Sequence, residues 1–130
     1  MSEKVIYNLL STNSPLIAQV PVSRIFAGTI PLGVTLPAVA YNFISGTKET
    51  AIGLTTTKTR GRIQVTIAAN TYPVVKQVMG LVKTACNNKQ GTFNGVATDS
   101  VILDLVGPDF RDDEQNIHYQ TVDFKIVFNE

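Results

Sequence analysis

The chain has 130 residues, a length that suits one domain over residues 1–130, and its net charge of +1 gives no electrostatic sign of nucleic-acid binding. Hydrophobic residues make up 44% of the sequence and charged residues 16%, below the roughly 25% of ordinary soluble domains, which indicates burial against partners. A single cysteine excludes an internal disulfide, and without a membrane-length apolar run or a signal peptide the chain is expected to be made in a cytosol.

The first third of the chain predicts two short helices, a brief strand and a loop. Residues 2–10 have apolar side chains at helical spacing, and Pro15 suits the first turn of a second short helix. Residues 24–27 predict a brief strand. Residues 28–37 contain two glycines and two prolines, which is typical of a loop.

Two strands and a long connection are predicted next. Residues 38–45 are rich in strand formers and apolar on both faces. Residues 46–59 are polar and threonine-rich, with Ile52 and Leu54 among them, and predict a long connection that is either an arm reaching a neighbour or an ordinary loop. Residues 60–69 alternate between apolar and polar side chains, as in a half-buried antiparallel strand.

A longer helix is predicted over residues 71–86. Thr71 can serve as its N-cap, and its apolar face covers more than half of its circumference. Gly80 lies on its polar stripe, where close approach of another chain would suit a residue without a side chain. Residues 87–91 are expected to end the helix.

The C-terminal part predicts a turn, a strand, a loop and a final strand. Asn94-Gly95 is a turn signal, and residues 101–106 form a strand that is apolar on both faces except at Asp104. Gly107 and Pro108 are expected to end that strand, and residues 109–116 to form an acidic loop. Residues 117–128 alternate as a long strand, with valine, isoleucine and phenylalanine facing inward.

These elements predict an α+β domain. We expect a mainly antiparallel sheet of about four strands, with an N-terminal helix and the longer helix over residues 71–86 packed on one face. Because helices cover only one face, the second apolar faces of residues 38–45 and 101–106 must meet the N-terminal helix or another subunit.

No pattern in the sequence predicts catalysis or a metal site. His118 is the single histidine, without cysteine nearby, and an isolated histidine is more often packed or exposed than a ligand. Cys86 lies at the C-terminal end of the predicted helix, where the helix dipole disfavours a thiolate. We therefore expect no enzyme, no metal and no cofactor.

Two charged clusters remain. Lys58, Arg60 and Arg62 are either the solvent side of a hairpin or a contact to a partner or to passing DNA, and without exposed aromatics they do not predict sequence-specific binding. The acidic cluster does not match a calcium-binding loop. It is either a solvated charge run or a polar rim that meets a basic partner surface, formed by Asp109, Asp112, Asp113 and Glu114.

Several local sequences occur in a telling order: SRIF, LPAVAY, the strand-to-helix junction AANTYP and the closing strand HYQTVDFKIVF. With the order of elements over nearly the whole chain, they resemble the tail-completion family of tailed bacteriophages, the gp17-like tail terminator or tail-to-head joining proteins. The resemblance implies a virion protein that forms a ring with itself, a hexamer in relatives. The ring would sit on the tail-tube protein, end tube growth and meet a head connector or neck protein, while DNA passes through its lumen.

This resemblance leads to a set of candidate subunit or tube contacts on the strands, because edge strands recruit other strands. The set comprises Tyr41, Phe43, Lys58, Arg60, Arg62, Tyr119 and Lys125. Two alternatives stay open. One is a head-closure or neck adaptor protein on the connector side, and the other is a small ligand-binding or enzymatic domain with a pocket near His118.

Overall fold

The computed structural model describes residues 2–31, 33–49, 58–114 and 116–129. The N-terminal part follows the prediction closely, because its caps and prolines act where the sequence places them. Asn13 accepts a hydrogen bond from the backbone N–H of Leu16 at 3.0 Å and so caps the second helix. The elements are α1 (Ser2–Ser11), α2 (Ser14–Gln19), the 3-10 helix η1 (Val22–Arg24) and β1 (Ile25–Ala27).

The rest of the described chain forms one helix and five strands, of which four are longer than predicted and one, β4, was not predicted. The predicted helix is confirmed to within one residue, although the Thr71 side chain makes no capping hydrogen bond. The elements are β2 (Ala38–Glu49), β3 (Lys58–Ala69), α3 (Tyr72–Cys86), β4 (Lys89–Phe93), β5 (Val96–Asp112) and β6 (Ile117–Asn129).

The sheet has six strands in the order β1-β2-β3-β6-β5-β4 and is mixed, because β1 runs parallel to β2. The predicted sheet of about four mainly antiparallel strands is therefore wrong. Two short edge strands account for much of the difference. β1 has three residues, and β4 (KQGTF) lacks the apolar alternation that marks a strand, so that its hairpin to β5 through Asn94-Gly95 is formed by turn geometry.

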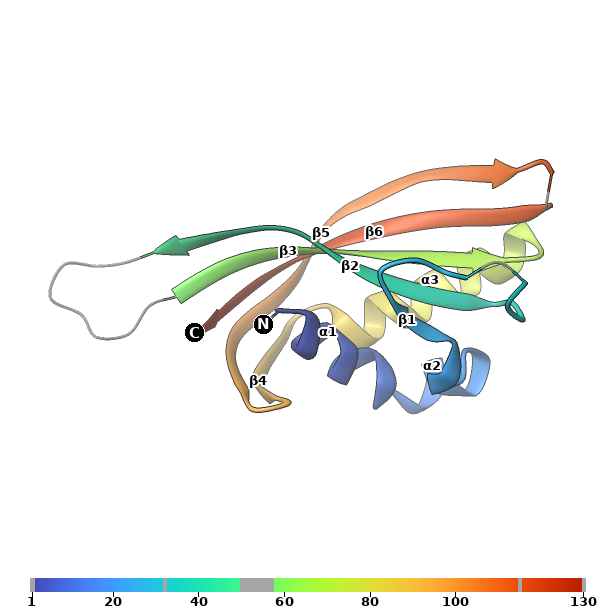
Figure 1. Ribbon diagram of the computed structural model, residues 1–130. Coiled ribbons are helices and arrows are strands. Elements are labelled where there is room, and N and C mark those ends of the chain that lie inside the picture. Colours follow the sequence, from blue (N-terminus) through green and yellow to red (C-terminus); the bar gives the residue numbers. More distant parts are fainter. Residues whose placement is uncertain (1, 32, 50–57, 115, 130) are drawn as a thin grey trace, which may run out of the picture.

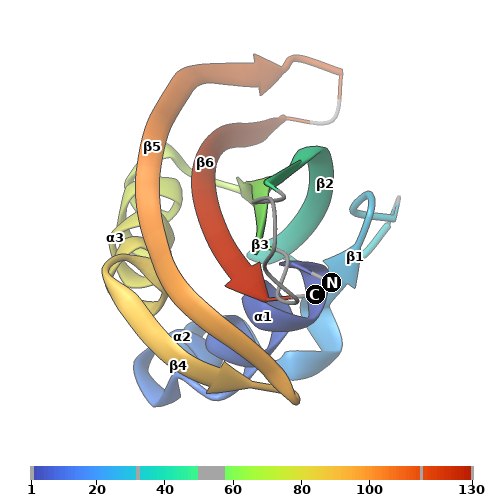
Figure 2. The same cartoon turned by 90° about the vertical axis from the view of Figure 1, so that its left-hand side faces the viewer.

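The three α-helices lie on one side of this sheet (Figure 1). The sheet itself bends strongly, and Figure 2 shows β5 and β6 arching so that the strands form half of a barrel. The alternation predicted for β3 and β6 is confirmed: the apolar side chains of both strands point toward the helices and are buried. The central residues of this layer are Ile63, Val65, Ile67, Val122, Phe124 and Ile126, against Val75, Val78, Met79 and Val82 of α3 and Val5, Ile6 and Leu10 of α1.

Strands β2 and β3 both extend beyond their predicted ends. β2 continues to Glu49 and β3 begins at Lys58, so the predicted connection over residues 46–59 is partly strand. Backbone pairing continues there although the side chains are polar; Thr47 and Lys48 are exposed, whereas Thr59 is buried. Ile52 and Leu54 lie outside the described residues.

β5 likewise runs through the predicted stop at Gly107 and Pro108, and its last residues, 109–112, occupy part of the predicted acidic loop. Bulges in its pairing with β6 absorb the irregular residues, including one between Val106 and Asp109 that contains Pro108. Both stop predictions are wrong because a glycine and a proline at a sheet edge can be accommodated by a bulge.

One end of the second sheet face is covered by the chain itself. Ala38 and Ala40 are buried there, under the segment of residues 28–31 and 33–37, whose Ile30 lies close to Tyr119. The N-terminal helix packs on the same side as α3 and does not cover this face. The expectation that a helix or another subunit must cover residues 38–45 is thus wrong at this end, because the loop supplies the cover.

Candidate assembly surfaces

The face of the sheet that turns away from α1 and α3, called the open face here, carries a cluster of paired charges. Arg62 of β3 forms ion pairs with Asp104 of β5 and, at 3.2 Å, with Asp123 of β6. Lys125 of β6 lies 3.3 Å from Asp104. All four come to one place because the sheet register puts Arg62 opposite Lys125 and moves Asp104 onto the open face at a bulge.

This charge cluster is balanced, with two basic and two acidic groups. Its members are partly exposed, and ion pairs of that kind contribute little to stability because water screens them. The ion pairs instead favour the observed register of β5 against β6, because a slip of β5 by one residue would turn Asp104 to the apolar side of the sheet. Asp104 is the one polar residue of the VILDLV strand. No sequence pattern accounted for a charge at this position, and the ion pairs with Arg62 and Lys125 now supply a reason for it.

Three of the predicted contact residues line one hollow beside the charge cluster. The hollow has a volume of about 200 Å³ and lies on the open face between β2, β3 and β6. Arg60, Arg62 and Lys125 lie at its wall, with Ser45 and Thr47 from β2. Lys58 lies apart from it and pairs with Asp99 of β5.

The aromatic candidates are divided among three places. Tyr119 stacks on Phe110 on the open face, with ring centroids 5.1 Å apart, and burial raises the pKa of Tyr119, with a further contribution from Asp112. Phe43 is about half exposed on β2. Tyr41 faces the helices instead, 6.0 Å from the ring of Tyr7, so the structure places it in the margin of the core.

The largest apolar exposure lies along β5, which the list of sequence candidates did not include. Ile102 is 51% exposed, Leu105 53% and Phe110 51%, and Val106 is exposed beside them. Scattered exposed apolar residues are ordinary, but several of them along one strand indicate a contact surface. The signal in the sequence was the two-faced apolar pattern of residues 101–106.

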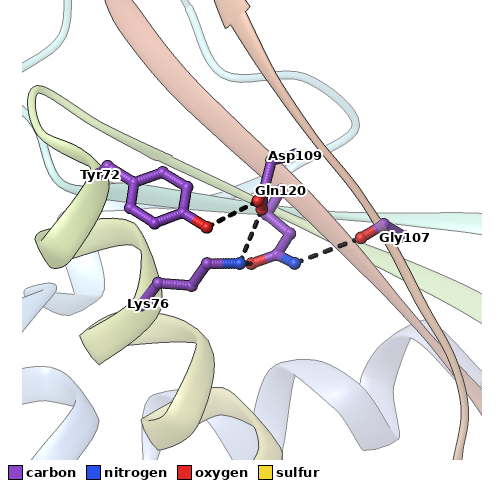
Figure 3. A network of polar contacts seen from close by, with 5 residues as sticks. All are labelled: Tyr72, Lys76, Gly107, Asp109 and Gln120. Carbon is purple, nitrogen blue, oxygen red and sulfur yellow. Dashed lines mark hydrogen bonds and ion pairs between the residues drawn. The ribbon is translucent and has the colours of Figure 1, made fainter.

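A polar network ties the far end of β5 to the start of α3 (Figure 3). Asp109 of β5 accepts hydrogen bonds from the Tyr72 hydroxyl at 2.8 Å and from Lys76 Nζ at 2.7 Å. Lys76 also donates to Gln120 Oε1 at 3.1 Å, and Gln120 Nε2 donates to the carbonyl oxygen of Gly107 at 3.2 Å. Helix α3 therefore holds both strands of the β5–β6 hairpin, and we call these five residues the α3 latch.

Charge and hydrogen bonding in the α3 latch shift the pKa values of both ionised partners. The hydrogen bond from Lys76, followed by that from Tyr72, lowers the pKa of Asp109, and the bond to Asp109 raises the pKa of Lys76. Asp109 thus differs from the rest of the predicted polar rim, because it is engaged with the helix. Asp112, Asp113 and Glu114 lie near the tip of the hairpin, where Arg111 approaches Asp113 at 3.7 Å.

Replacing Lys76 with methionine is expected to return the pKa of Asp109 upward. The carboxylate stabilises the folded state above its ordinary pKa of 3.8, and this contribution is lost as the pH falls through the lowered folded value. In Lys76→Met that acid-sensitive contribution should shrink. Carboxyl carbon NMR titration measures the shift, with Gln77→Met on the same exposed turn as control. An unchanged pKa of Asp109 would show that Lys76 does not hold it.

The two residues considered for chemistry, Cys86 and His118, lie in different surroundings. Burial raises the pKa of the Cys86 thiol to about 12. His118 stands edge-on to Tyr72, with ring centroids 6.2 Å apart. Within residues 2–31, 33–49, 58–114 and 116–129, no group of three or more histidine, cysteine or acidic side chains is placed to hold a metal ion. In the same part of the chain no helix is long and apolar enough to cross a bilayer.

The fold matches that of a chain in a solved virion structure. A chain from a solved structure described as "Virion of native gene transfer agent (GTA) particle" superposes with a TM-score of 0.70, over 96% of this chain and 92% of that chain, at 11% sequence identity. A comparison with curated proteins gave no match.

The sequence itself supplies the particular family. Residues 4–129 match the family described as "Tail completion protein gp17", and the chain belongs to that family. It is accordingly a structural protein of a phage-type tail and is located in the virion. The resemblance drawn from the local sequences SRIF, LPAVAY and AANTYP is thereby confirmed.

Proposed function

We propose that copies of this chain form a ring that caps the tail tube, ends tube growth and joins the tail to the head. The observation that carries the proposal is the apolar exposure on both outer parts of the sheet, with Phe43 and Ile44 on β2 and Ile102, Leu105 and Val106 on β5. A subunit with one such surface on each side suits a cyclic assembly, in which every copy has two neighbours. Family membership supports the same role.

The size of the subunit is compatible with a ring. Two neighbour contacts of about 800 Å² each would cover about a quarter of its 6987 Å² surface. The partners are then other copies of the chain, in a hexamer by analogy with the family, together with the tail-tube protein and a head connector or neck protein. DNA crosses the lumen without sequence-specific binding.

The remaining candidate residues take places in this scheme. The hollow lined by Arg60, Arg62 and Lys125 offers a polar surface to the tube or connector, and Lys58 lies apart from it, paired with Asp99. The hairpin tip with Asp113 offers an acidic surface at the other end of the sheet. The two ends of the subunit therefore suit two different partners, as a joint between tail and head requires.

Electron microscopy of particles made without this protein tests the proposal. Overlong or unjoined tails are expected, because nothing would stop the tube or bind the head. Tails of normal length that lack heads would favour the neck-adaptor role over termination. Normal, infectious virions would contradict the proposal, provided that complementation with the intact chain is shown to place it in the particle.

A further inference from the structure

The two edges of the sheet are bare over different lengths. On one side β1 pairs only with Val39–Tyr41 of β2, and the remainder of β2 up to Glu49 has no strand on its outer side within the described residues. On the other side β4 pairs with β5 only as far as Val101. Beyond that point the Leu103 N–H donates a hydrogen bond to Asn87 Oδ1 at 2.9 Å, and among the described residues no strand flanks the rest of β5. Among the described residues, each edge of the sheet therefore carries one short strand, which projects. The rest of the edge has no strand beside it and is called the recess here.

The pairing register shows which parts of the two edges stand level. A row is a set of residues paired across the sheet. Ile25 of β1 stands in the row that ends at Asp109 of β5, which runs Ile25–Val39–Ile67–Gln120–Asp109. Ala27 stands in the row that ends at Val106, which runs Ala27–Tyr41–Val65–Val122–Val106. At the other end of the sheet, Lys89 of β4 stands in the row of Gly46 of β2, which runs Lys89–Val101–Ile126–Gly61–Gly46. Gly91 stands in the row of Lys48, which runs Gly91–Thr98–Phe128–Thr59–Lys48.

Each projection is thus level with the recess on the opposite edge. β1 stands level with Val106–Asp109 of β5, and β4 stands level with Gly46–Lys48 of β2; among the described residues no strand flanks either segment on its outer side. The strand directions also agree, since three antiparallel pairings separate β2 from β5 and β1 runs with β2. A neighbouring β1 would therefore lie antiparallel to β5, which is an ordinary sheet pairing.

Side chains along these edges complement one another. Eight large hydrophobic side chains are exposed among the described residues, and six of them belong to β2 or β5: Phe43, Ile44, Ile102, Leu105, Val106 and Phe110. Charge agrees at one of the two contacts. Arg24 directly precedes β1, and the row of its neighbour Ile25 ends at Asp109, beyond which the acidic residues Asp112 and Asp113 follow along the chain. Pro108 offers no N–H, so apolar packing and charge contribute more here than a full ladder of hydrogen bonds.

We propose that a second copy of this chain occupies each edge, with β1 of one copy beside residues 106–109 of β5 of the next, and β4 of that next copy beside residues 46–48 of β2 of the first. This inference rests on the proposed ring. Because the matching parts are level, rotation alone brings the copies together, without a shift along the strands. Rotation without translation closes a ring, whereas an added shift would give a helical filament.

Paired cysteines test this arrangement in the purified full chain. Ala27 and Val106 share a row and lie four strand spacings apart in one molecule, about 19 Å when followed along the sheet, and a disulfide spans only roughly 7 Å between Cα atoms. Ala27→Cys with Val106→Cys should therefore give, on mild oxidation, a ladder of covalent oligomers up to the ring. Each single variant should stop at dimers. Cys86 is buried and adds no background.

Two further cysteine pairs make the result decisive. Ser45→Cys with Ile102→Cys should give no ladder. In the proposed contact, β2 of one copy and β5 of the next are held one strand width apart by β1 and β4, so these two positions do not touch. Gln77→Cys with Val106→Cys, in which Gln77 lies on exposed α3, should give none either. Rings in native mass spectrometry without the Ala27–Val106 ladder, a ladder from the Ser45–Ile102 pair, or a chain that is monomeric at all concentrations would each overturn the inference.

A substitution gives an independent readout. Val106→Glu should lower the fraction of rings at least about tenfold at a concentration where Gln77→Glu leaves it unchanged, because a buried charge would enter the contact. Both sites are exposed in the monomer, so unchanged thermal unfolding shows that the fold is intact. Equal ring fractions would overturn the inference, while the tail phenotype of particles lacking the protein judges the proposed function separately.

Discussion

Replacing Phe124 with alanine is expected to lower the free energy of unfolding by about 3–5 kcal/mol, as large-to-small changes at fully buried aromatics do. Phe124 has no exposed surface and stands in the central row of the sheet between Ile63 of β3 and Leu103 of β5. Since domains of this size are stable by about 5–15 kcal/mol, about a fifth of the total stability or more is at stake.

Urea unfolding followed by circular dichroism measures this loss. Phe110→Ala is the matched control, because Phe110 is about half exposed on the open face and contacts mainly Tyr119. It should cost no more than about 1.5 kcal/mol, the value of an aromatic pair. Similar losses for the two variants would mean that the helices do not seal the inner face of the sheet as described.

Gly107→Ala is expected to destabilise the protein by about 1–3 kcal/mol, because it overpacks a closed contact. A Cβ atom at this position would lie 2.2 Å from Thr121 Oγ1 and 3.1 Å from the Thr121 carbonyl oxygen. The hydroxyl can rotate away, but the backbone carbonyl cannot. The bulge beside Pro108 would then move, and with it the α3 latch, which binds the Gly107 carbonyl oxygen.

The opposite sign is expected at Gly80. No atom lies within 4 Å of a Cβ built there, so Gly80→Ala should stabilise α3 by about 0.5–1 kcal/mol. Thermal unfolding of the two alanine variants side by side tests both statements. Hydrogen exchange should also show faster opening of residues 107–112 in Gly107→Ala alone. Destabilisation by both substitutions would indicate that Gly80 is in closer contact than described.

Periodicity was the reliable part of the sequence. The alternation of residues 60–69 and 117–128 and the wide apolar face of residues 71–86 each report burial on one side of an element, and the structure confirms all three. Strand ends and short strands were less predictable. Pairing at a sheet edge depends on the neighbouring strand, so Gly107 and Pro108 did not stop β5, and Lys89–Phe93 became a strand without any apolar pattern.

The candidate contacts show the same division. Arg60, Arg62 and Lys125 were identified because they alternate with core residues, and the structure brings them to one hollow. The α3 latch was missed because its hydrogen-bonded partners are 13 to 44 residues apart in sequence. Only the curvature of the sheet brings the helix start beneath the hairpin, and no local pattern encodes that contact.

The position of β6 in the middle of the sheet has a consequence for synthesis. This strand leaves the ribosome after every other strand, yet it lies between β3 and β5. At about 5–20 residues per second, the β2–β3 and β4–β5 hairpins wait roughly a second or more as separate pieces with unjoined inner edges. The complete sheet cannot form before β6 inserts between β3 and β5, so a fragment that lacks β6 would lack the paired edges that the proposed ring requires.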